Sequence, residues 1–139
     1  MQQAQTSFTL STNGQGLYEF TRDVITWVNS SGVETGLLTL FCKHTSASLT
    51  IQENADPDVQ VDLQGFFARL VPEHMEWLRH TMEGPDDMPA HIKSALTDVS
   101  LNIPINNGRP TLGTWQGIYL FEHRHHPHNR QIIAHLIGE

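Results

Sequence analysis

Residues 99–124 have the sequence VSLNIPINNGRPTLGTWQGIYLFEHR, and this stretch decides the fold. Apolar and polar residues alternate over 99–105, as in a strand with one buried face. The Asn107-Gly108 pair that follows is a dipeptide strongly favoured in two-residue β-hairpin turns. A second and longer strand is predicted from about Thr111 to Arg124. Strands joined by so short a turn pair antiparallel, so the sequence favours antiparallel sheet.

The long predicted strand has two different faces. The strand period of two places Gln116 and Glu122 on one face, on either side of an apolar pair, and Trp115 on the other face. Gln116 and Glu122 are therefore candidate site residues, whereas Trp115 is predicted to pack. Gly113 and Gly117 inside a strand predict a bulge or the close approach of another segment.

The remaining elements are a mixture of strands and helices. Strands are predicted at 6–11, 17–20, 37–44, 47–53 and 131–137, and helices at 21–30, at 57–71 and after 86. If 37–44 and 47–53 form a hairpin, its loop is very short. The order predicts one domain over residues 1–139 with an α+β fold: mainly antiparallel, β-sandwich-like sheets and two to three helices.

Composition excludes several classes of protein. The 139 residues carry 8 Lys plus Arg and a formal net charge of −7, which disfavours a nucleic-acid partner. No apolar run approaches the roughly 18 residues of a membrane span, so no membrane partner is expected. The only cysteine, Cys42, shares a strand face with leucines and is predicted to be a buried, inert thiol. A lone cysteine and the lack of a signal-peptide pattern predict a cytoplasmic location.

Residues 80–93, HTMEGPDDMPAHIK, have the features of a built site. Gly84-Pro85 predicts a turn, and Asp86 or Asp87 can cap a short helix that has His91 in its first turn. His80 lies on the loop that leads to this helix. Since a helix start disfavours protonation of a nearby imidazole, His91 is expected to be neutral and able to bind a metal. The alternative is a capped helix with two surface histidines.

Three neutral imidazoles and a water would form an open, catalytic type of metal site. The candidates are His44, His80 and His91, although their spacing matches no local metal signature. The alternative for His44, at the end of a buried strand, is a hydrogen bond to the backbone. The predicted ion is divalent: zinc suits imidazole ligands best, and magnesium or manganese are alternatives.

A denser histidine group occupies the turn before the last strand. It is interpreted as surface, with adventitious metal affinity, and comprises His123, His125, His126 and His128. Asp56, directly before Pro57, is interpreted as a helix cap more readily than as a catalytic residue.

Three stretches resemble the signatures of the YjbQ family. They are HTSASLTIQENADPDV at 44–59, EGPDDMPAHIKS at 83–94 and GRPTLGTWQGIYL at 108–120, the last followed by Glu122-His123-Arg124. The resemblance implies an α+β sandwich-like fold, a homotrimer and a weak thiamine-phosphate synthase activity. In that reaction a hydroxymethylpyrimidine diphosphate is joined to a thiazole phosphate and pyrophosphate is released.

The resemblance also implies which residues form the site. The family's recurring histidines fall at His44, His80 and His91. Its recurring polar residues fall at Ser46 as a substrate-binding candidate and at four catalytic candidates: Asn54, Asp56, Gln116 and Glu122. No glycine-rich phosphate loop is present, so a small phosphorylated metabolite would be bound by a metal, by a helix start, or by Lys93 and Arg109.

Two other functions stay open at this point. One is a protein that binds a metal or a phosphorylated metabolite, with the synthase activity incidental. The other is a metal-dependent hydrolase, because an open histidine site activates water.

Overall fold

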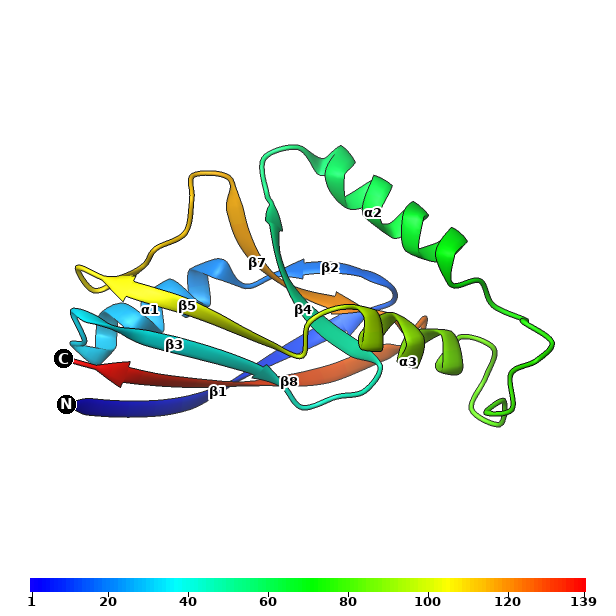
Figure 1. Cartoon of the computed structure of the whole chain (residues 1–139), viewed down its shortest axis with the longest axis horizontal. Coiled ribbons are helices and arrows are strands. Elements are labelled where there is room, and N and C mark those ends of the chain that lie inside the picture. Colours follow the sequence, from blue (N-terminus) through cyan, green and yellow to red (C-terminus); the bar gives the residue numbers. More distant parts are fainter.

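The computed structural model describes all 139 residues as two antiparallel sheets and three helices (Figure 1). The five-stranded sheet has the order β1 (Gln2–Asn13), β8 (Pro127–Gly138), β3 (Thr35–Cys42), β5 (Ser100–Asn106) and β6 (Arg109–Pro110). The three-stranded sheet has the order β2 (Gly16–Glu19), β7 (Gln116–Glu122) and β4 (Ala47–Glu53). The helices are α1 (Thr21–Ser31), α2 (Pro57–Leu70) and α3 (Asp87–Leu96). The predicted α+β class is confirmed.

Strand alternation builds one core between the sheets. Leu38, Leu40 and Cys42 of β3 are buried, and so are every second residue of β5 and β8. They pack with apolar residues of β4, β7 and α1 in a single cluster. The prediction that Cys42 is buried is confirmed.

The Asn107-Gly108 turn forms as predicted, but its hairpin is short. Both residues have positive φ, 51° and 73°, as this type of turn requires. Only Asn106 with Arg109 and Ile105 with Pro110 pair across it.

The long strand predicted from 111 to 124 is corrected to Gln116–Glu122, and it lies in the other sheet. The Gln116 side-chain oxygen accepts a hydrogen bond from the Gly113 backbone amide at 2.8 Å. The Gln116 backbone amide donates to the Gly113 carbonyl at 3.1 Å. This turn breaks the strand before Gln116. Trp115 is 63% exposed, so its predicted packing is wrong. Gly117 is approached closely, but by side chains and not by another backbone, because a Cβ there would lie 2.7 Å from Glu19 Oε2 and 3.1 Å from side-chain atoms of Asn54.

Residues 37–44 and 47–53 do not form a hairpin. Both edges of β3 are occupied, by β8 on one side and β5 on the other. The chain therefore crosses to the other sheet through residues 43–46, and β4 pairs with β7. His44 lies in this crossing loop, three residues before the start of β4.

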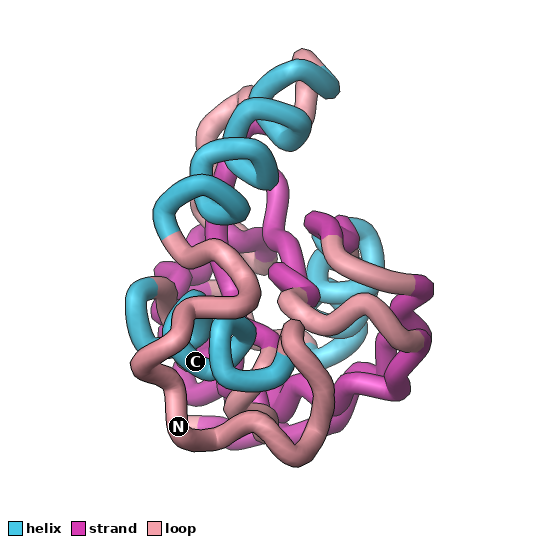
Figure 2. Tube along the Cα trace, turned by 90° about the vertical axis from the view of Figure 1, so that its right-hand side faces the viewer, coloured by secondary structure: helices cyan, strands magenta, loops and turns pink.

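Helix α2 begins as predicted, with Asp56 Oδ1 accepting from the Asp58 amide at 2.9 Å and Pro57 in the first turn. Its apolar stripe, however, is only partly covered, because Phe67 packs edge-on against Phe121 of β7 while the end of the stripe is exposed. Phe66 is 58% and Leu70 53% exposed, and no residue of the helix is fully buried. Figure 2 shows the helix projecting beyond the sheets. None of the three helices combines the length and the apolarity needed to cross a membrane.

Candidate metal centre

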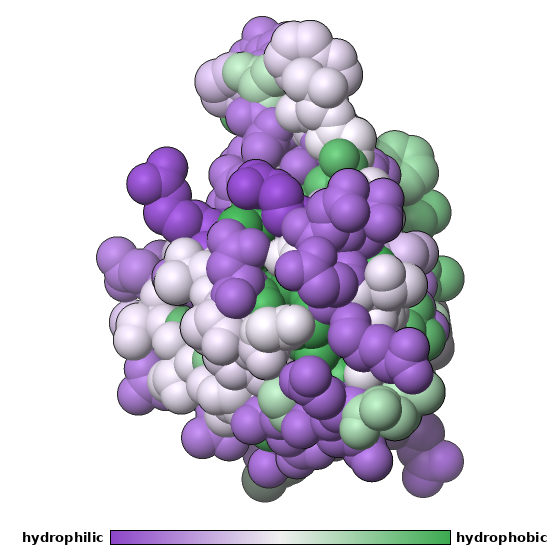
Figure 3. Space-filling view, turned by 90° about the vertical axis from the view of Figure 1, so that its left-hand side faces the viewer, coloured by the Kyte–Doolittle hydropathy of each residue, from purple (hydrophilic) through white to green (hydrophobic).

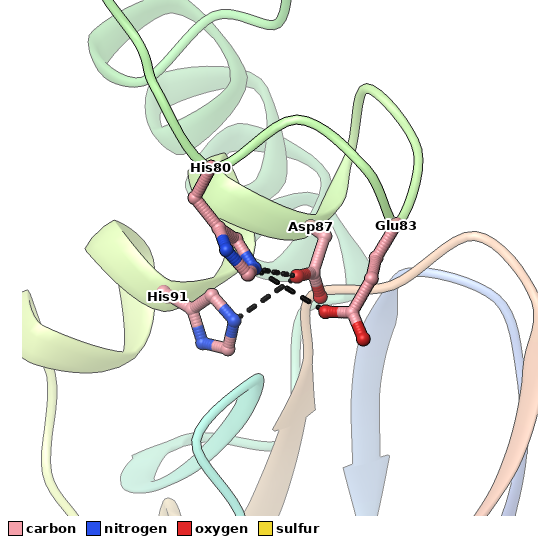
Figure 4. A group of neighbouring side chains, drawn as sticks. All are labelled: His80, Glu83, Asp87 and His91. Atoms are coloured by element: carbon pink, nitrogen blue, oxygen red, sulfur yellow. Dashed lines mark hydrogen bonds and ion pairs between the residues drawn. The ribbon is translucent and has the colours of Figure 1, made fainter.

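Four metal-ligating side chains converge at the first turn of α3: His80, Glu83, Asp87 and His91 (Figure 4). One ligand atom from each lies within 4.8 Å of all the others. Asp87 Oδ2 is 2.7 Å from His80 Nε2 and 3.1 Å from His91 Nε2. Glu83 Oε2 is 3.2 Å from His80 Nε2. Two imidazoles and two carboxylates thus point toward one small volume.

The local sequence explains this convergence. Asp87 and His91 are four residues apart in α3, so they share one face of the helix. Gly84 has a φ of 101°, which allows the sharp bend that returns His80 and Glu83 to that face. The predicted helix start is confirmed, but the predicted cap is not, because no side chain caps its amides.

Arg124, just after β7, fixes the orientation of Asp87. Its Nη1 donates to Asp87 Oδ1 at 2.6 Å, its Nε to Asp86 Oδ2 at 3.0 Å, and its Nη2 to the Glu83 carbonyl at 3.0 Å. Asp86, the expected cap, instead accepts one bond from Arg124 Nε and one from the His125 amide. Because Oδ1 of Asp87 is held by Arg124, Oδ2 faces the two imidazoles.

The tautomer of His91 tests whether the residues fit a metal. Its Nδ1 lies 2.8 Å from the Thr45 carbonyl, which can only accept, so Nδ1 carries a proton. In the neutral ring Nε2 then has a lone pair that faces the lone pairs of Asp87 Oδ2. Two acceptors at 3.1 Å repel each other unless a proton or a cation lies between them. An imidazole oriented by a backbone carbonyl is a common feature of metal sites, and the donor set therefore fits a divalent ion.

The charges also favour a cation. A hydrogen bond with Asp87 raises the pKa of His80 above its usual value. Burial alone would raise the pKa of Asp87, but its bond with His80 and the nearby charges, including that of Arg124, hold that pKa below its usual value. The two carboxylates of the cluster share one guanidinium, that of Arg124, so further positive charge there would come from a proton on His80 or from a bound cation.

The structure brings His80 and His91 together but leaves His44 outside the cluster. His44 Nε2 accepts a hydrogen bond from the Gln131 amide at 2.8 Å, which is the alternative considered from the sequence. Burial and the charge of Arg130 lower the pKa of His44. His44, from the crossing loop, and His91, from α3, line one cavity of about 270 Å³.

Glu122 lies in a buried hydrogen-bonded network rather than at the cluster. It is 0% exposed and accepts from Arg130 Nε at 2.7 Å and from Thr12 Oγ1 at 2.6 Å. Burial alone would raise its pKa, but these bonds and the Arg130 charge lower it. Arg130 also donates to Ser46 Oγ at 3.0 Å, which engages the candidate Ser46 in the same network.

The other three catalytic candidates lie at the far end of the three-stranded sheet. Gln116 pairs with Glu53 there, whereas Glu122 pairs with Ala47 at the opposite end. Six strand residues span about 20 Å, so Gln116 and Glu122 cannot touch one small ligand within one chain. Asn54 donates to Glu19 Oε2 at 3.0 Å, and Asp56 caps α2.

Lys93 and Arg109 do not reach the cluster either. Lys93 is two residues after His91, and therefore points to a different side of α3, where it is 6% exposed and lines a separate cavity with Glu73 and His125. Burial lowers the pKa of Lys93, although the nearby carboxylates of Glu73 and Asp86 act to raise it. Arg109 is exposed beside Asn106, at the end of β5 remote from α3. The surface at that end of the molecule mixes hydrophilic residues with residues of intermediate hydropathy and a few apolar ones (Figure 3).

The predicted surface histidine group is partly wrong. His123 is 1% exposed, and its Nε2 lies 2.9 Å from Ser48 Oγ. Burial lowers the pKa of His123 to about 3, so the ring is neutral at neutral pH. His125 and His126 are exposed as predicted, His128 is half-buried, and His125 pairs with Glu73 at 2.7 Å.

Sequence reasoning missed Glu83 and Asp87 as ligands and Arg124 as the residue that orients them. The helical spacing of Asp87 and His91 was a usable signal, because i and i+4 side chains meet on one face. Nothing in the local pattern pointed to Arg124, which lies 37 residues away from Asp87 in the chain.

The fold and the cluster define an α+β protein of curled antiparallel sheets with a two-histidine, two-carboxylate centre beside a short helix. The sequence profile described as UPF0047 protein YjbQ-like matches residues 6–139. The chain belongs to the YjbQ family. It is 57% identical over 137 residues to the UPF0047 protein sll1880 of Synechocystis, covering 99% of this chain and 93% of that one. It is 48% identical over 136 residues to the UPF0047 protein YjbQ of Salmonella typhimurium, covering 97% and 98% of the two chains.

Solved structures have the same fold. The hypothetical protein APE1520 from Aeropyrum pernix aligns with a TM-score of 0.88 at 28% identity, over 98% of this chain and 99% of that one. The conserved hypothetical protein TT1486 from Thermus thermophilus aligns with a TM-score of 0.85 at 38% identity, over 95% and 99%.

The Glu122–Arg130 pair predicts a large effect on stability. Replacing Glu122 by Ala leaves a buried guanidinium unpaired, and we expect the free energy of unfolding to fall by about 3–5 kcal/mol. Urea denaturation measures this change. The double variant Glu122→Leu/Arg130→Met should lose much less than the sum of its single variants, and additive losses would contradict the pairing. Glu83→Ala, at an exposed carboxylate, is the control and should change stability by about 0.5 kcal/mol or less.

Proposed function

We propose that the protein is a metal-dependent enzyme acting on a small phosphorylated metabolite. His80, Asp87 and His91 would hold the ion, with Glu83 on its solvent side. The observation that carries the proposal is the position of Asp87 Oδ2, which faces two imidazole Nε2 atoms at 2.7 and 3.1 Å. The hydrogen bond from His91 Nδ1 to the Thr45 carbonyl leaves a lone pair directed at this point.

Zinc is the ion that this donor set suits best. Imidazole nitrogens and carboxylate oxygens bind zinc at about 2.0–2.2 Å, and three protein ligands leave a position open. Manganese accepts the same mixture, whereas magnesium prefers oxygen ligands and fits less well.

Charge supports a phosphorylated substrate only if the ion is bound. The chain has a net charge of −7, and Arg124, the arginine at the cluster, is already bonded to Asp86, Asp87 and the Glu83 carbonyl. No other cationic side chain of the cluster is free to hold a diphosphate. When bound, a divalent metal would supply the positive charge that stabilises phosphoryl oxygens and a pyrophosphate leaving group.

Membership of the YjbQ family makes a thiamine-phosphate synthase-like condensation the reaction that we propose. It joins hydroxymethylpyrimidine diphosphate to thiazole phosphate and releases pyrophosphate. In such a reaction the protein mainly positions the two reactants. A second candidate is a metal- or metabolite-binding protein. It is favoured by the distance of Gln116 and Asn54 from the cluster, which leaves no neutral polar catalytic candidate next to the ion.

We also propose a homotrimer, which the family resemblance suggests. Helix α2 supports it, because Phe66 and Leu70, four residues apart on one face, are 58% and 53% exposed on a helix that projects from the body. Exposed apolar patches of this kind are typical of interaction surfaces.

His91→Ala should sharply reduce bound zinc, because it removes a ligand and its fixed lone pair. The measurement is the metal content of protein loaded with zinc and then passed through a desalting column, determined by mass spectrometry. His126→Ala is the matched control, since His126 lies in the exposed histidine turn and should leave the metal content unchanged. Equal metal contents in both variants would contradict the assignment.

The zinc-loaded protein should form thiamine phosphate slowly from the two precursors, and a chelator should suppress the product because the diphosphate then lacks a positive partner. Product is measured by chromatography against a blank without protein, beside a panel of phosphoesters that tests for hydrolysis. Absence of product from metal-loaded protein would favour the binding-protein function.

Sedimentation at micromolar concentration should give a trimer. Phe66→Glu should shift the protein toward smaller species, because it places a charge on the apolar face of α2. Met82→Glu, at a 94% exposed site on the loop before α3, is the control. A wild-type monomer would exclude the proposed assembly.

A further inference from the structure

A cavity of about 270 Å³ lies directly beside the metal centre. His91 belongs to both, since it lines the cavity and faces Asp87 Oδ2. The cavity is lined by apolar groups of Ala47, Ala95 and Val99, and by no lysine or arginine. It therefore suits an uncharged organic group better than a phosphate.

His44 contributes a hydrogen-bond donor to this cavity. The Gln131 amide donates to its Nε2 at 2.8 Å, so in the neutral ring the only proton lies on Nδ1. No protein acceptor lies within hydrogen-bonding distance of Nδ1. Since burial lowers the pKa of His44, the ring is neutral at pH 7 and the tautomer is defined.

This arrangement makes His44 a poor metal ligand. Its Nε2 lone pair is used by the backbone, and its Nδ1 would have to lose a proton before it could bind an ion. His91 has the opposite arrangement, because its proton is held by the Thr45 carbonyl and its lone pair is free. Of the two histidines that line this cavity, His44 thus presents a hydrogen-bond donor and His91 presents a lone pair that can bind a metal.

Ser94 also lines this cavity, but its hydroxyl is turned away from solvent and would have to rotate about the Cα–Cβ bond to reach a ligand. Its Oγ is buried and has no hydrogen-bond partner. Such unpartnered groups are rare in folded proteins and call for a partner that the protein itself does not supply. Ser94 is three residues after His91 in α3, so both lie on the same side of the helix.

We propose that this cavity is the subsite for the organic part of the substrate, a small neutral aromatic ring bearing hydrogen-bond acceptors. The His44 Nδ1–H would bind the edge of the ring between the apolar side chains of the cavity, and the Ser94 hydroxyl would bind a second acceptor after rotation of its side chain. A cavity of about 150 Å³ accommodates benzene, so about 270 Å³ admits one substituted ring. The position of the ring beside the metal rests on the proposed function, whereas binding of the ring does not.

The test uses the full-length protein, loaded with zinc, and unphosphorylated hydroxymethylpyrimidine as the probe. Nitrogen-15 NMR should show His44 protonated on Nδ1, and its resonances should shift as the probe saturates the site. Ser94→Ala and His44→Phe should weaken binding by about tenfold or more. His44→Asn, whose amide nitrogen can replace Nδ1–H, should bind the probe far better than His44→Phe. His126→Ala is the control and should bind like the wild type.

Several results would overturn the inference. They are His44 protonated on Nε2, unchanged probe binding in Ser94→Ala and His44→Phe, no saturable binding by wild type, or loss of zinc from His44→Asn. The small Ser94→Ala change keeps the test valid if His44→Phe fails to fold. Probe binding that persists in zinc-free His91→Ala protein would support the ring subsite independently of the metal, whereas absence of product from zinc-loaded wild type that still binds the probe would overturn the proposed function alone.

Discussion

The buried ion pair between Glu122 and Arg130 ties the two sheets together. Glu122 ends β7 in the three-stranded sheet, and Arg130 lies on β8 in the five-stranded sheet. Two buried charges are costly unless every lone pair and proton is used, and here Thr12, Ser46 and the amides of the next two residues complete the set. Because all of these partners must surround Glu122, the position at which β7 ends is fixed relative to β8. The residue two positions later, Arg124, then emerges at the height of α3 and holds Asp87. The geometry of the candidate metal centre therefore depends on a pair of residues that do not touch it.

Three consecutive residues after the core of β7 have three different environments. Glu122 is ionised in a pair, His123 is neutral against Ser48, and Arg124 bridges two aspartates. From the sequence only His123, counted with the histidine-rich turn, was predicted to lie on the surface, whereas Glu122 was a candidate site residue. Their burial comes from the way the end of β7 meets β4, β8 and α3, which is a property of the whole fold. The wrong prediction for His123 has this origin, because the periodicity of one strand does not reveal what covers its end.

Other features could be predicted because their causes are local. The alternation in β5, the positive φ values of Asn107 and Gly108, and the capping of α2 by Asp56 each depend on neighbouring residues only. His80 and His91 were also identified, because a helix start is recognisable from sequence. The break before Gln116 was missed, since it depends on a side chain bonding to a glycine amide three residues earlier. The separation of Gln116 from Glu122 by the length of β7 was also hidden, because a shared face of a strand does not mean a shared site.

Two backbone groups, the Thr45 carbonyl and the Gln131 amide, decide where the protons of His91 and His44 lie. Neither group belongs to a side chain, so no substitution at position 45 or 131, other than proline at 131, deletes the contact. The chemical identity of each imidazole is instead encoded in the path of the main chain through the crossing loop and the start of β8. A relative could replace the side chains of both segments and keep the same pair of proton positions. Conversely, one residue inserted into residues 43–46 would displace the Thr45 carbonyl and His44 from their partners without altering either histidine. The proton positions of the two imidazoles thus depend on the length of the crossing loop as well as on the histidines themselves.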